Sequence, residues 1–151
     1  MRWVEAAWLR GFEWVVDWCD GIALRKRDEA AHLTTGRRGE RAAFFYLRRL
    51  GYVVAARGWK SGHARGDLDL VAWDGDTVCF VEVKTRTTRA VAPAEVSVDE
   101  DKQRILMRLA RHYLRQLPEG DVLVRFDILS IYFEAGRQAE FELFRGAFGW
   151  S

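Results

Sequence analysis

Cysteine and histidine are scarce in this 151-residue chain, and neither forms a recognisable ligand pattern. Cys19 and Cys79 lie far apart, so they provide neither a disulfide framework nor a set of zinc ligands. Cys79 stands within an apolar stretch, which is typical of a small buried thiol. The histidines are isolated from one another, and no Ser-His-Asp or Cys-His arrangement is visible. Zinc chemistry and triad hydrolysis are therefore not predicted.

Long apolar runs are missing as well. No stretch approaches the roughly 20 residues that a membrane-spanning helix needs. Arg2, Glu5 and Arg10 place charges where a signal peptide would have an apolar core. A glycine-rich nucleotide-binding loop is also absent. We therefore expect a cytoplasmic protein with no membrane partner.

The chain has no large excess of charge of either sign. The 24 Lys and Arg residues nearly balance the 22 Asp and Glu residues, and the net charge is +2. The whole molecule is therefore not expected to attract nucleic acid through its net charge. Basic residues do cluster locally, as in Arg25-Lys26-Arg27, Arg37-Arg38 and Arg48-Arg49. A site for a polyanion must accordingly be a patch.

Residues 2–20 have the pattern of a strongly amphipathic helix. Its charged residues share one arc of the helical wheel, and most of the rest is apolar, including Trp3, Trp8, Trp14 and Trp18. Such a surface must be buried, either on the chain's own core or in a homodimer or a protein partner. The polar face is net acidic, which disfavours a membrane surface. We assign 1–35 to this helix and a polar connector.

The remaining residues, 36–151, are predicted to form one α/β domain. Helices are expected at 38–50, ending at Gly51, and at 98–117, ending at Pro118. The Asp74-Gly75 pair between two apolar runs predicts a hairpin. The expected architecture is a mixed sheet of about five strands flanked by helices, in two or three layers. The strands are expected at 52–57, 67–73, 77–85, 122–133 and 140–144.

Two carboxylates and an ammonium group are predicted to converge at the ends of strands 67–73 and 77–85. Side chains alternate between the faces of a strand, so Glu82 and Lys84 share one side. Pairing within the hairpin can bring Asp69 beside Glu82. Carboxylate oxygens suit a hard cation such as Mg²⁺, and a lysine could position water or neutralise a phosphate. An exposed Glu-Lys pair of little consequence is the alternative, although charges on a central strand need a reason.

Glu40 is a third candidate carboxylate. On the helix 38–50 it shares a face with Ala43, Phe44 and Leu47, so it points toward the core. A buried carboxylate is normally paired, neutralised or bound to a metal. Stabilisation of the first helical turn through the helix dipole is the simpler interpretation of Glu40 alone. Beside Asp69 and Glu82, it becomes a credible member of the same site.

In their order and spacing, these residues resemble the PD-(D/E)XK nuclease signature. More narrowly, they resemble the YraN-type family of predicted endonucleases, which is related to archaeal Holliday-junction resolvases. The resemblance covers about residues 36–133 and departs from the usual pattern at Asp67, commonly Glu, and at Gly58, commonly Asn. The matching segments are Gly39-Glu40, 66–71, 80–86, Lys102-Gln103, Ala110 with Tyr113-Leu114, and 125–127.

The resemblance implies a restriction-endonuclease-like core and a role for each matched position. Glu40, Asp69 and Glu82 would surround one or two Mg²⁺ or Mn²⁺ ions, and Lys84 would take the role of the signature lysine. These four are the predicted catalytic residues, and the three acids are the predicted metal ligands. Second-rank candidates without an assigned role are Lys102, Arg125 and Asp127.

Basic side chains around this cluster are predicted to contact nucleic acid. Arginines recur at intervals of four and three along one face of the helix 98–117, where they could bind successive phosphates. A solvated helix face is the alternative. The predicted nucleic-acid-binding residues are Lys60, Arg65, Arg86, Lys102, Arg104, Arg108 and Arg111.

Taken together, the sequence predicts a metal-dependent endonuclease that hydrolyses phosphodiester bonds in DNA, with branched DNA as one candidate substrate. Two other functions remain open. The chain can be a nucleic-acid-binding module that kept the fold without the activity. It can also be an interaction adaptor that works through the N-terminal helix.

Overall fold

The structure is a computed structural model that describes residues 29–89 and 98–150. The chain divides into two compact units, 1–35 and 36–151, and the second unit contains the sheet. The predicted helix 2–20, with its proposed dimer or partner surface, lies outside the described residues. Among the residues described, no helix has the length and apolar character needed to cross a membrane.

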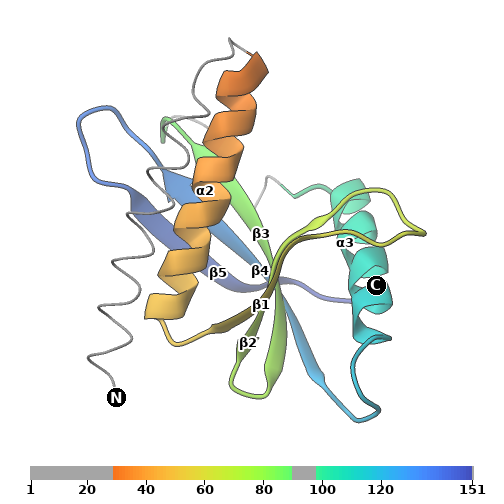
Figure 1. The fold of residues 1–151 in the computed structure, drawn as a ribbon. Helices are drawn as coiled ribbons and strands as arrows, with labels where there is room; N and C mark the ends of the chain where they lie inside the picture. The colour runs from red at the N-terminus through yellow and green to blue at the C-terminus, as the bar shows by residue number, and fades with distance from the viewer. Residues whose placement is uncertain (1–28, 90–97, 151) are drawn as a thin grey trace. The chain divides into compact units, whose positions relative to one another are not determined.

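The predicted α/β class is confirmed, with a mixed five-stranded sheet and flanking helices (Figure 1). Several boundaries differ from the predictions by a few residues, because side-chain patterns locate the ends of an element less sharply than its middle. The elements, in chain order, are α2 (Glu29–Arg49), β1 (Val53–Trp59), β2 (Leu68–Asp74), β3 (Thr77–Arg86), α3 (Glu100–Leu114), β4 (Leu123–Tyr132) and β5 (Glu140–Phe148).

Helix α2 begins at Glu29, well before the predicted helix start near Arg38, so the last residues of the predicted connector are helical. This first part of α2 has no apolar stripe for periodicity to detect. Once a helix has been nucleated, however, each added residue gains a hydrogen bond, and Ala30 and Ala31 are strong helix formers. The helix ends at Arg49, one residue before its predicted last residue, and the predicted stop Gly51 follows it with a φ of 94°, which suits glycine.

The strands follow one another in space as β1-β2-β3-β4-β5. Only β3 and β4 are parallel, and α3 makes the crossover that a parallel pair requires. The predicted hairpin is confirmed: Asp74 pairs with Thr77 across a two-residue turn. Gly75, the first turn residue, has a φ of 58°, the left-handed conformation that hairpin turns demand.

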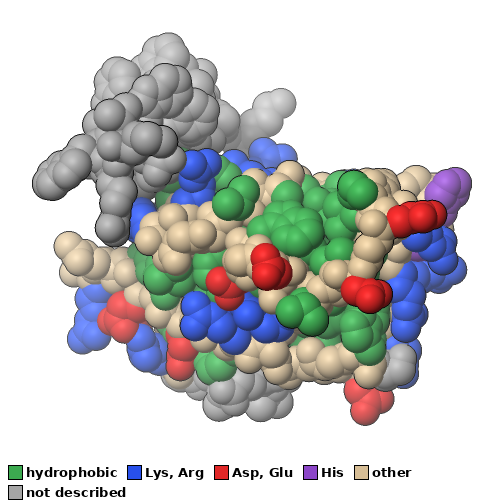
Figure 2. Space-filling model, turned by 90° about the horizontal axis from the view of Figure 1, so that it is seen from below, with side chains coloured by type: hydrophobic (Ala, Val, Ile, Leu, Met, Phe, Trp, Pro, Cys, Tyr) green, Lys and Arg blue, Asp and Glu red, His purple; other side chains and the backbone are tan. Residues whose placement is uncertain are grey.

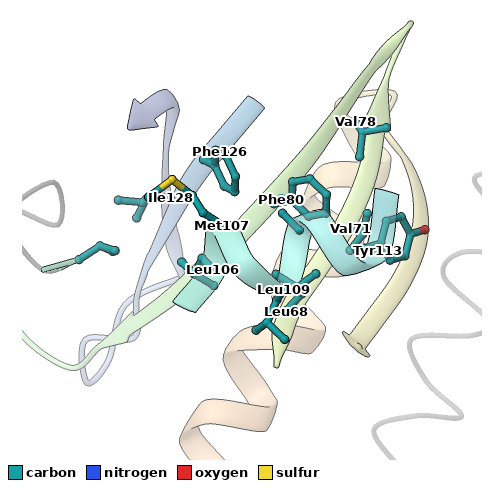
Figure 3. Close-up of a cluster of buried hydrophobic side chains, with 12 residues drawn as sticks. Leu68, Val71, Val78, Phe80, Leu106, Met107, Leu109, Tyr113, Phe126 and Ile128 are labelled. Atoms are coloured by element: carbon teal, nitrogen blue, oxygen red, sulfur yellow. The ribbon is translucent and has the colours of Figure 1, made fainter. Parts of the chain in front are cut away.

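Helix α3 covers one face of the sheet through a cluster of buried apolar side chains. The close-up in Figure 3 shows Leu106, Leu109 and Tyr113 of α3 directed toward sheet residues that include Phe80 and Phe126. Burial of each large apolar side chain contributes roughly 1.5–3 kcal/mol to the stability of the fold. This packing holds the N-terminal turn of α3 near the end of β3.

A second cluster packs α2 against the other face of the sheet, through Leu47, Leu70, Val81 and Leu129 among others. One contact brings the helix especially close to β3. A Cβ atom added to Gly39 would lie 1.9 Å from the Thr85 hydroxyl oxygen, so only glycine permits this approach. The close contact places the next residue, Glu40, near the strand ends where the predicted site lies.

Candidate metal and phosphate site

The pairing of β2 with β3 brings Asp69 and Glu82 to adjacent positions. Leu70 lies opposite Val81 in this antiparallel pair, and the two acids follow immediately beyond it. The Oδ2 atom of Asp69 accepts a hydrogen bond of 2.8 Å from the Val83 amide, which bridges the strands just past their last ladder pair. The orientation of Asp69 is therefore set by the backbone of β3.

Glu82 is the centre of the cluster, and only 5% of it is exposed. Its Oε1 atom lies 3.1 Å from Lys84 Nζ and 3.3 Å from Lys102 Nζ. Its Oε2 atom is buried and has no hydrogen-bond partner among the residues described. An unpaired buried acceptor costs roughly 1–3 kcal/mol. Proteins usually retain such an atom where a water, an ion or a ligand satisfies it.

The two lysines come from different elements. Lys84 lies two residues after Glu82 on β3, and alternation along the strand places both on the face that α3 covers. Lys102 lies in the first turn of α3, where Asp99 caps the helix by accepting a hydrogen bond of 2.8 Å from the Lys102 amide. Both ammonium groups remain partly exposed, so they can also reach a ligand in solvent.

The acids influence one another's protonation. Burial is the main reason that the pKa of Asp69 rises to about 7, and the charges of Glu82 and Glu40 raise it further. The pKa of Glu40 is raised as well, first by burial and then by Asp67. Glu40, Asp69 and Glu82 therefore lie within electrostatic reach of one another. A cation near these carboxylates would relieve their mutual repulsion.

The carboxylates of the cluster meet the requirements of a divalent metal only in part. Within residues 29–89 and 98–150, no three His, Cys, Asp or Glu side chains are arranged closely enough to hold an ion by themselves. Magnesium commonly binds through one or two carboxylates and completes its octahedron with waters and substrate phosphates. Asp69 and Glu82, with the unpartnered Oε2 atom, fit that smaller requirement.

The raised pKa of Asp69 predicts how the stability of the metal-free protein depends on pH. An unfolded Asp has a pKa of 3.8, whereas the folded value is about 7, so between these values only the folded state keeps the proton. This contribution to stability is complete below the lower value and is lost as pH rises through the upper one, at about 1.4 kcal/mol per pH unit. Between pH 5 and pH 6.5 we expect wild type to lose about 2 kcal/mol relative to Asp69→Asn.

Urea unfolding in a chelating buffer measures this difference. The Asn side chain still offers an oxygen to the Val83 amide, so the comparison isolates the charge. Asp76→Asn, on the exposed hairpin turn, removes the same charge and serves as the control. If the free energy of unfolding changes with pH to the same extent in wild type and in Asp69→Asn, the pKa of Asp69 is not raised by folding.

The predicted nucleic-acid-binding residues have different surroundings. On the face drawn in Figure 2, Lys and Arg side chains occur in separate groups with Asp and Glu between them. Within the arginine row, Arg104 pairs with Asp101, and Arg111 lies over the Trp150 ring at 5.2 Å. Arg108, Lys60 and Arg65 are exposed, and Arg86 lies at the end of β3 with its Nε atom buried and unpartnered among the described residues.

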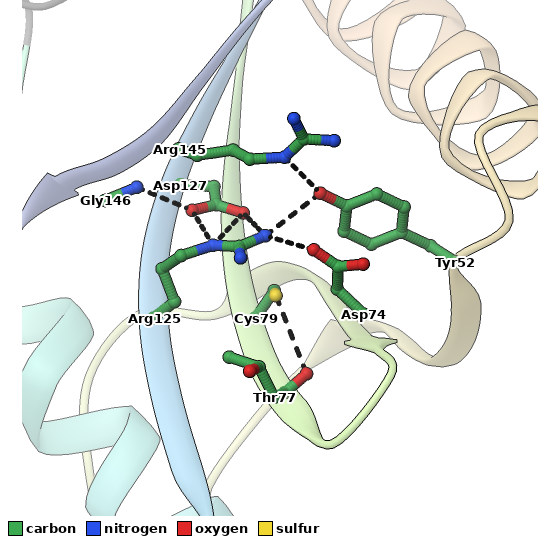
Figure 4. Close-up of polar contacts among 8 residues, drawn as sticks. All are labelled: Tyr52, Asp74, Thr77, Cys79, Arg125, Asp127, Arg145 and Gly146. Carbon is green, nitrogen blue, oxygen red and sulfur yellow. Dashed lines mark hydrogen bonds and ion pairs between the residues drawn. The ribbon is translucent and has the colours of Figure 1, made fainter.

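Arg125 and Asp127 lie away from Glu82, on the face of the sheet that packs against α2. Figure 4 shows them in a network with Asp74, Tyr52 and Arg145. Asp127 is fully buried, and its Oδ1 atom accepts hydrogen bonds of 2.8 Å from Arg125 Nε and 2.9 Å from the Gly146 amide. This saturated arrangement gives both residues a structural role in joining β4 and β5.

The structure also brings together polar residues that sequence reasoning did not single out. Ser130 of β4 lies beside Lys84 in the parallel register, and its buried hydroxyl has no partner among the described residues. Ser61 lies 2.6 Å from His112, although 51 residues separate them in the chain. The position of Ser130 within the apolar pattern of a strand was a weak sequence signal for a buried polar group. No local sequence pattern could have revealed the contact between Ser61 and His112.

The chain is similar in sequence to known proteins over most of its length. Residues 39–131 match the model of the uncharacterised protein family UPF0102. A UPF0102 protein of Koribacter versatilis is 46% identical over 125 residues, which cover 83% of this chain and 86% of that one. One from Solibacter usitatus is 42% identical over 113 residues, covering 75% and 84%. One from Desulfosudis oleivorans is 36% identical, covering 75% and 88%.

Proposed function

Because the chain belongs to UPF0102, the YraN-type family that its motifs resemble, we propose that it is a metal-dependent endonuclease that hydrolyses phosphodiester bonds in DNA. The carboxylate of Glu82 carries this proposal. It is buried, one oxygen contacts two lysines, and the other oxygen has no partner among the described residues. A structural ion pair would not need to leave that oxygen unsatisfied.

Asp69 and Glu82 would hold Mg²⁺ or Mn²⁺, with Glu40 assisting through a water or a second ion. The ion would supply Lewis-acid polarisation of a phosphate oxygen and a more acidic bound water. Asp69 must lose its proton to act as a ligand, and its pKa of about 7 makes this competition significant near neutral pH. Metal affinity should therefore increase as pH rises through 7.

Lys84 and Lys102 have different tasks in this proposal. Lys84 continues β3 on the same face as Glu82, where its ammonium group can orient the attacking water or neutralise charge that develops on the phosphate. Lys102 is fixed in the first turn of α3 and anchors Glu82 from the other side. With two lysines on one oxygen, the carboxylate is held with its second oxygen available for a metal.

DNA is the proposed substrate class because the family resemblance implies it, and the partly exposed Lys84 and Lys102 at the cluster can contact backbone phosphates, which supply affinity without sequence choice. Branched DNA is the structured substrate that the relation to junction resolvases suggests. A second candidate function is phosphate binding without hydrolysis. The contacts between Glu82 and the two lysines favour it, because they compensate the acidic charge even without a metal.

Labelled linear, flapped and four-way-junction DNA, incubated with Mg²⁺, Mn²⁺ or a chelator, separates the two functions. We expect cleavage that requires the metal and disappears in Glu82→Gln, which keeps the size of the side chain. Binding that persists without cleavage under all conditions, and is equal in Glu82→Gln, would support the non-catalytic function. Calorimetric titration of Mn²⁺ into wild type and Glu82→Gln measures the metal site independently of activity.

A further inference from the structure

A pocket separate from the Glu82 cluster lies on the same side of the molecule as α3, where the loop between β1 and β2 runs alongside that helix (Figure 1). Its volume is about 360 Å³, within the range of roughly 300–1,000 Å³ that small-ligand sites occupy. Four of its lining residues are basic or imidazole side chains, namely Lys60, His63, His112 and Arg115. No lining residue is acidic. The pocket is thus suited to an anion.

Two contacts build the pocket from separate elements. The ring of Trp59 meets the ring of Tyr113 edge-on at 5.3 Å, which anchors the end of β1 to α3. Two residues after Trp59, Ser61 Oγ lies 2.6 Å from His112 Nδ1. These contacts hold the loop against the helix before any ligand arrives. A preorganised site loses less conformational entropy on binding.

The contacts of Ser61 bear on what His112 can offer. Ser61 Oγ accepts the amide hydrogen of His63 at 3.2 Å and lies 2.6 Å from His112 Nδ1, where the direction of the hydrogen bond depends on the tautomer of the imidazole. In the tautomer in which Ser61 donates to Nδ1, the other ring nitrogen, Nε2, carries a hydrogen and is a donor to an anion. A nucleophilic serine would instead pair with Nε2 and have an acid on Nδ1, so this contact does not match an activated serine.

The helix dipole opposes this site, but by less than the side chains favour it. The pocket lies at the C-terminal end of α3, where the helix carries roughly half a negative charge. Lys60 and Arg115 each contribute a full positive charge, and the two imidazoles add donors. The positive charges of Lys60 and Arg115 therefore outweigh the negative end of the helix dipole, and the pocket attracts a phosphate group.

We propose that this pocket binds a backbone phosphate of the nucleic acid at a fixed distance from the scissile bond, with Lys60, Arg115 and His112 as its ligands. Lys102 at the catalytic cluster and His112 are ten positions apart on α3, which corresponds to roughly 15 Å. Base pairs rise about 3.4 Å along the duplex axis, so the two sites are about four base pairs apart along that axis if the duplex lies parallel to α3. The inference rests on the proposed nuclease function and adds a fixed spacing between the DNA phosphate bound in the pocket and the catalytic cluster.

Fluorescence anisotropy with labelled junction and duplex DNA, in Ca²⁺ to prevent cleavage, tests the pocket through Lys60→Gln/Arg115→Gln. We expect binding about tenfold weaker or more near 0.1 M salt, because charge-assisted contacts are lost. The slope of log K against log salt should fall by about 1 for each phosphate contact removed. The control is Arg48→Gln/Arg137→Gln, which removes the same charge at exposed positions outside the pocket.

These measurements distinguish failure of the proposed phosphate pocket from failure of the proposed nuclease activity. Equal affinity and salt slope in the two double variants would overturn the pocket, even if wild type cleaves DNA. Weaker binding in the pocket variant alone would support the pocket, even if no variant cleaves. Orthophosphate titrated alone is expected to bind only weakly. Tight orthophosphate binding that leaves DNA affinity unchanged would identify a free-phosphate site and overturn the nucleic-acid assignment.

Discussion

Lys84→Ala is expected to reduce the rate of DNA cleavage by about 100- to 1,000-fold at saturating Mn²⁺, the loss seen when one group that stabilises developing charge is removed. The ammonium group lies 3.1 Å from Glu82 Oε1 and is partly exposed, so it can serve both the carboxylate and a phosphate. Single-turnover cleavage measures the effect on chemistry. Calorimetry should find Mn²⁺ binding largely retained, because Asp69 and Glu82 remain.

The variant should also remain folded, because Glu82 keeps its contact with Lys102 at 3.3 Å. Lys84→Arg tests the geometry of the site, because a planar guanidinium retains the charge but not the compact ammonium. We expect it to recover little activity. Arg137→Gln, a charge removed from the exposed turn between β4 and β5, should match wild type. Cleavage by Lys84→Ala within threefold of wild type would exclude the proposed role of Lys84.

Asp127→Ala is expected to destabilise the fold by about 3 kcal/mol, near the lower end of the roughly 3–5 kcal/mol typical of breaking a buried ion pair. The substitution leaves the Gly146 amide without its acceptor and takes the carboxylate from Arg125. Arg125 keeps hydrogen bonds to Asp74 at 2.9 Å and to Tyr52 at 3.0 Å and is partly exposed, which limits the loss. Chemical denaturation measures the change.

This experiment also separates structure from chemistry at two positions that the family resemblance marked without a role. Glu134→Ala breaks an exposed ion pair with Arg137 and should cost no more than about 1 kcal/mol. Mn²⁺ affinity of folded Asp127→Ala should equal that of wild type, because Asp127 faces the opposite side of the sheet from Glu82. Unchanged stability together with lost cleavage would instead give Asp127 a direct part in the reaction.

The amount that could be predicted from sequence differed between elements for physical reasons. Strands β2 and β3 were predicted within a residue, because their apolar runs are bounded by a hairpin turn that needs Gly75. The start of α2 was missed because its polar first turns carry no periodic signal. The end of α3 was predicted late: Leu117 still satisfies the apolar period, but the regular helix stops at Leu114.

The candidate site divides in the same way. Alternation along β3 was sufficient to place Glu82 and Lys84 on one face, and a two-residue hairpin was sufficient to place Asp69 beside them. These are local relations that a single strand or turn determines. The contact of Lys102 with Glu82 depended on where α3 docks on the sheet. The burial of Glu82 and its unpartnered oxygen could not be predicted, because they depend on packing from both layers.

The sequence by itself determined the order of helices and strands, the hairpin, and the shared face of the acidic and basic groups on β3, because each follows from short-range backbone geometry. Only the tertiary structure decided which polar groups meet across elements: Lys102 with Glu82, Arg125 with Asp74, and Ser61 with His112. Such meetings depend on how helices pack on the sheet, and packing is settled by the fit of many side chains at once.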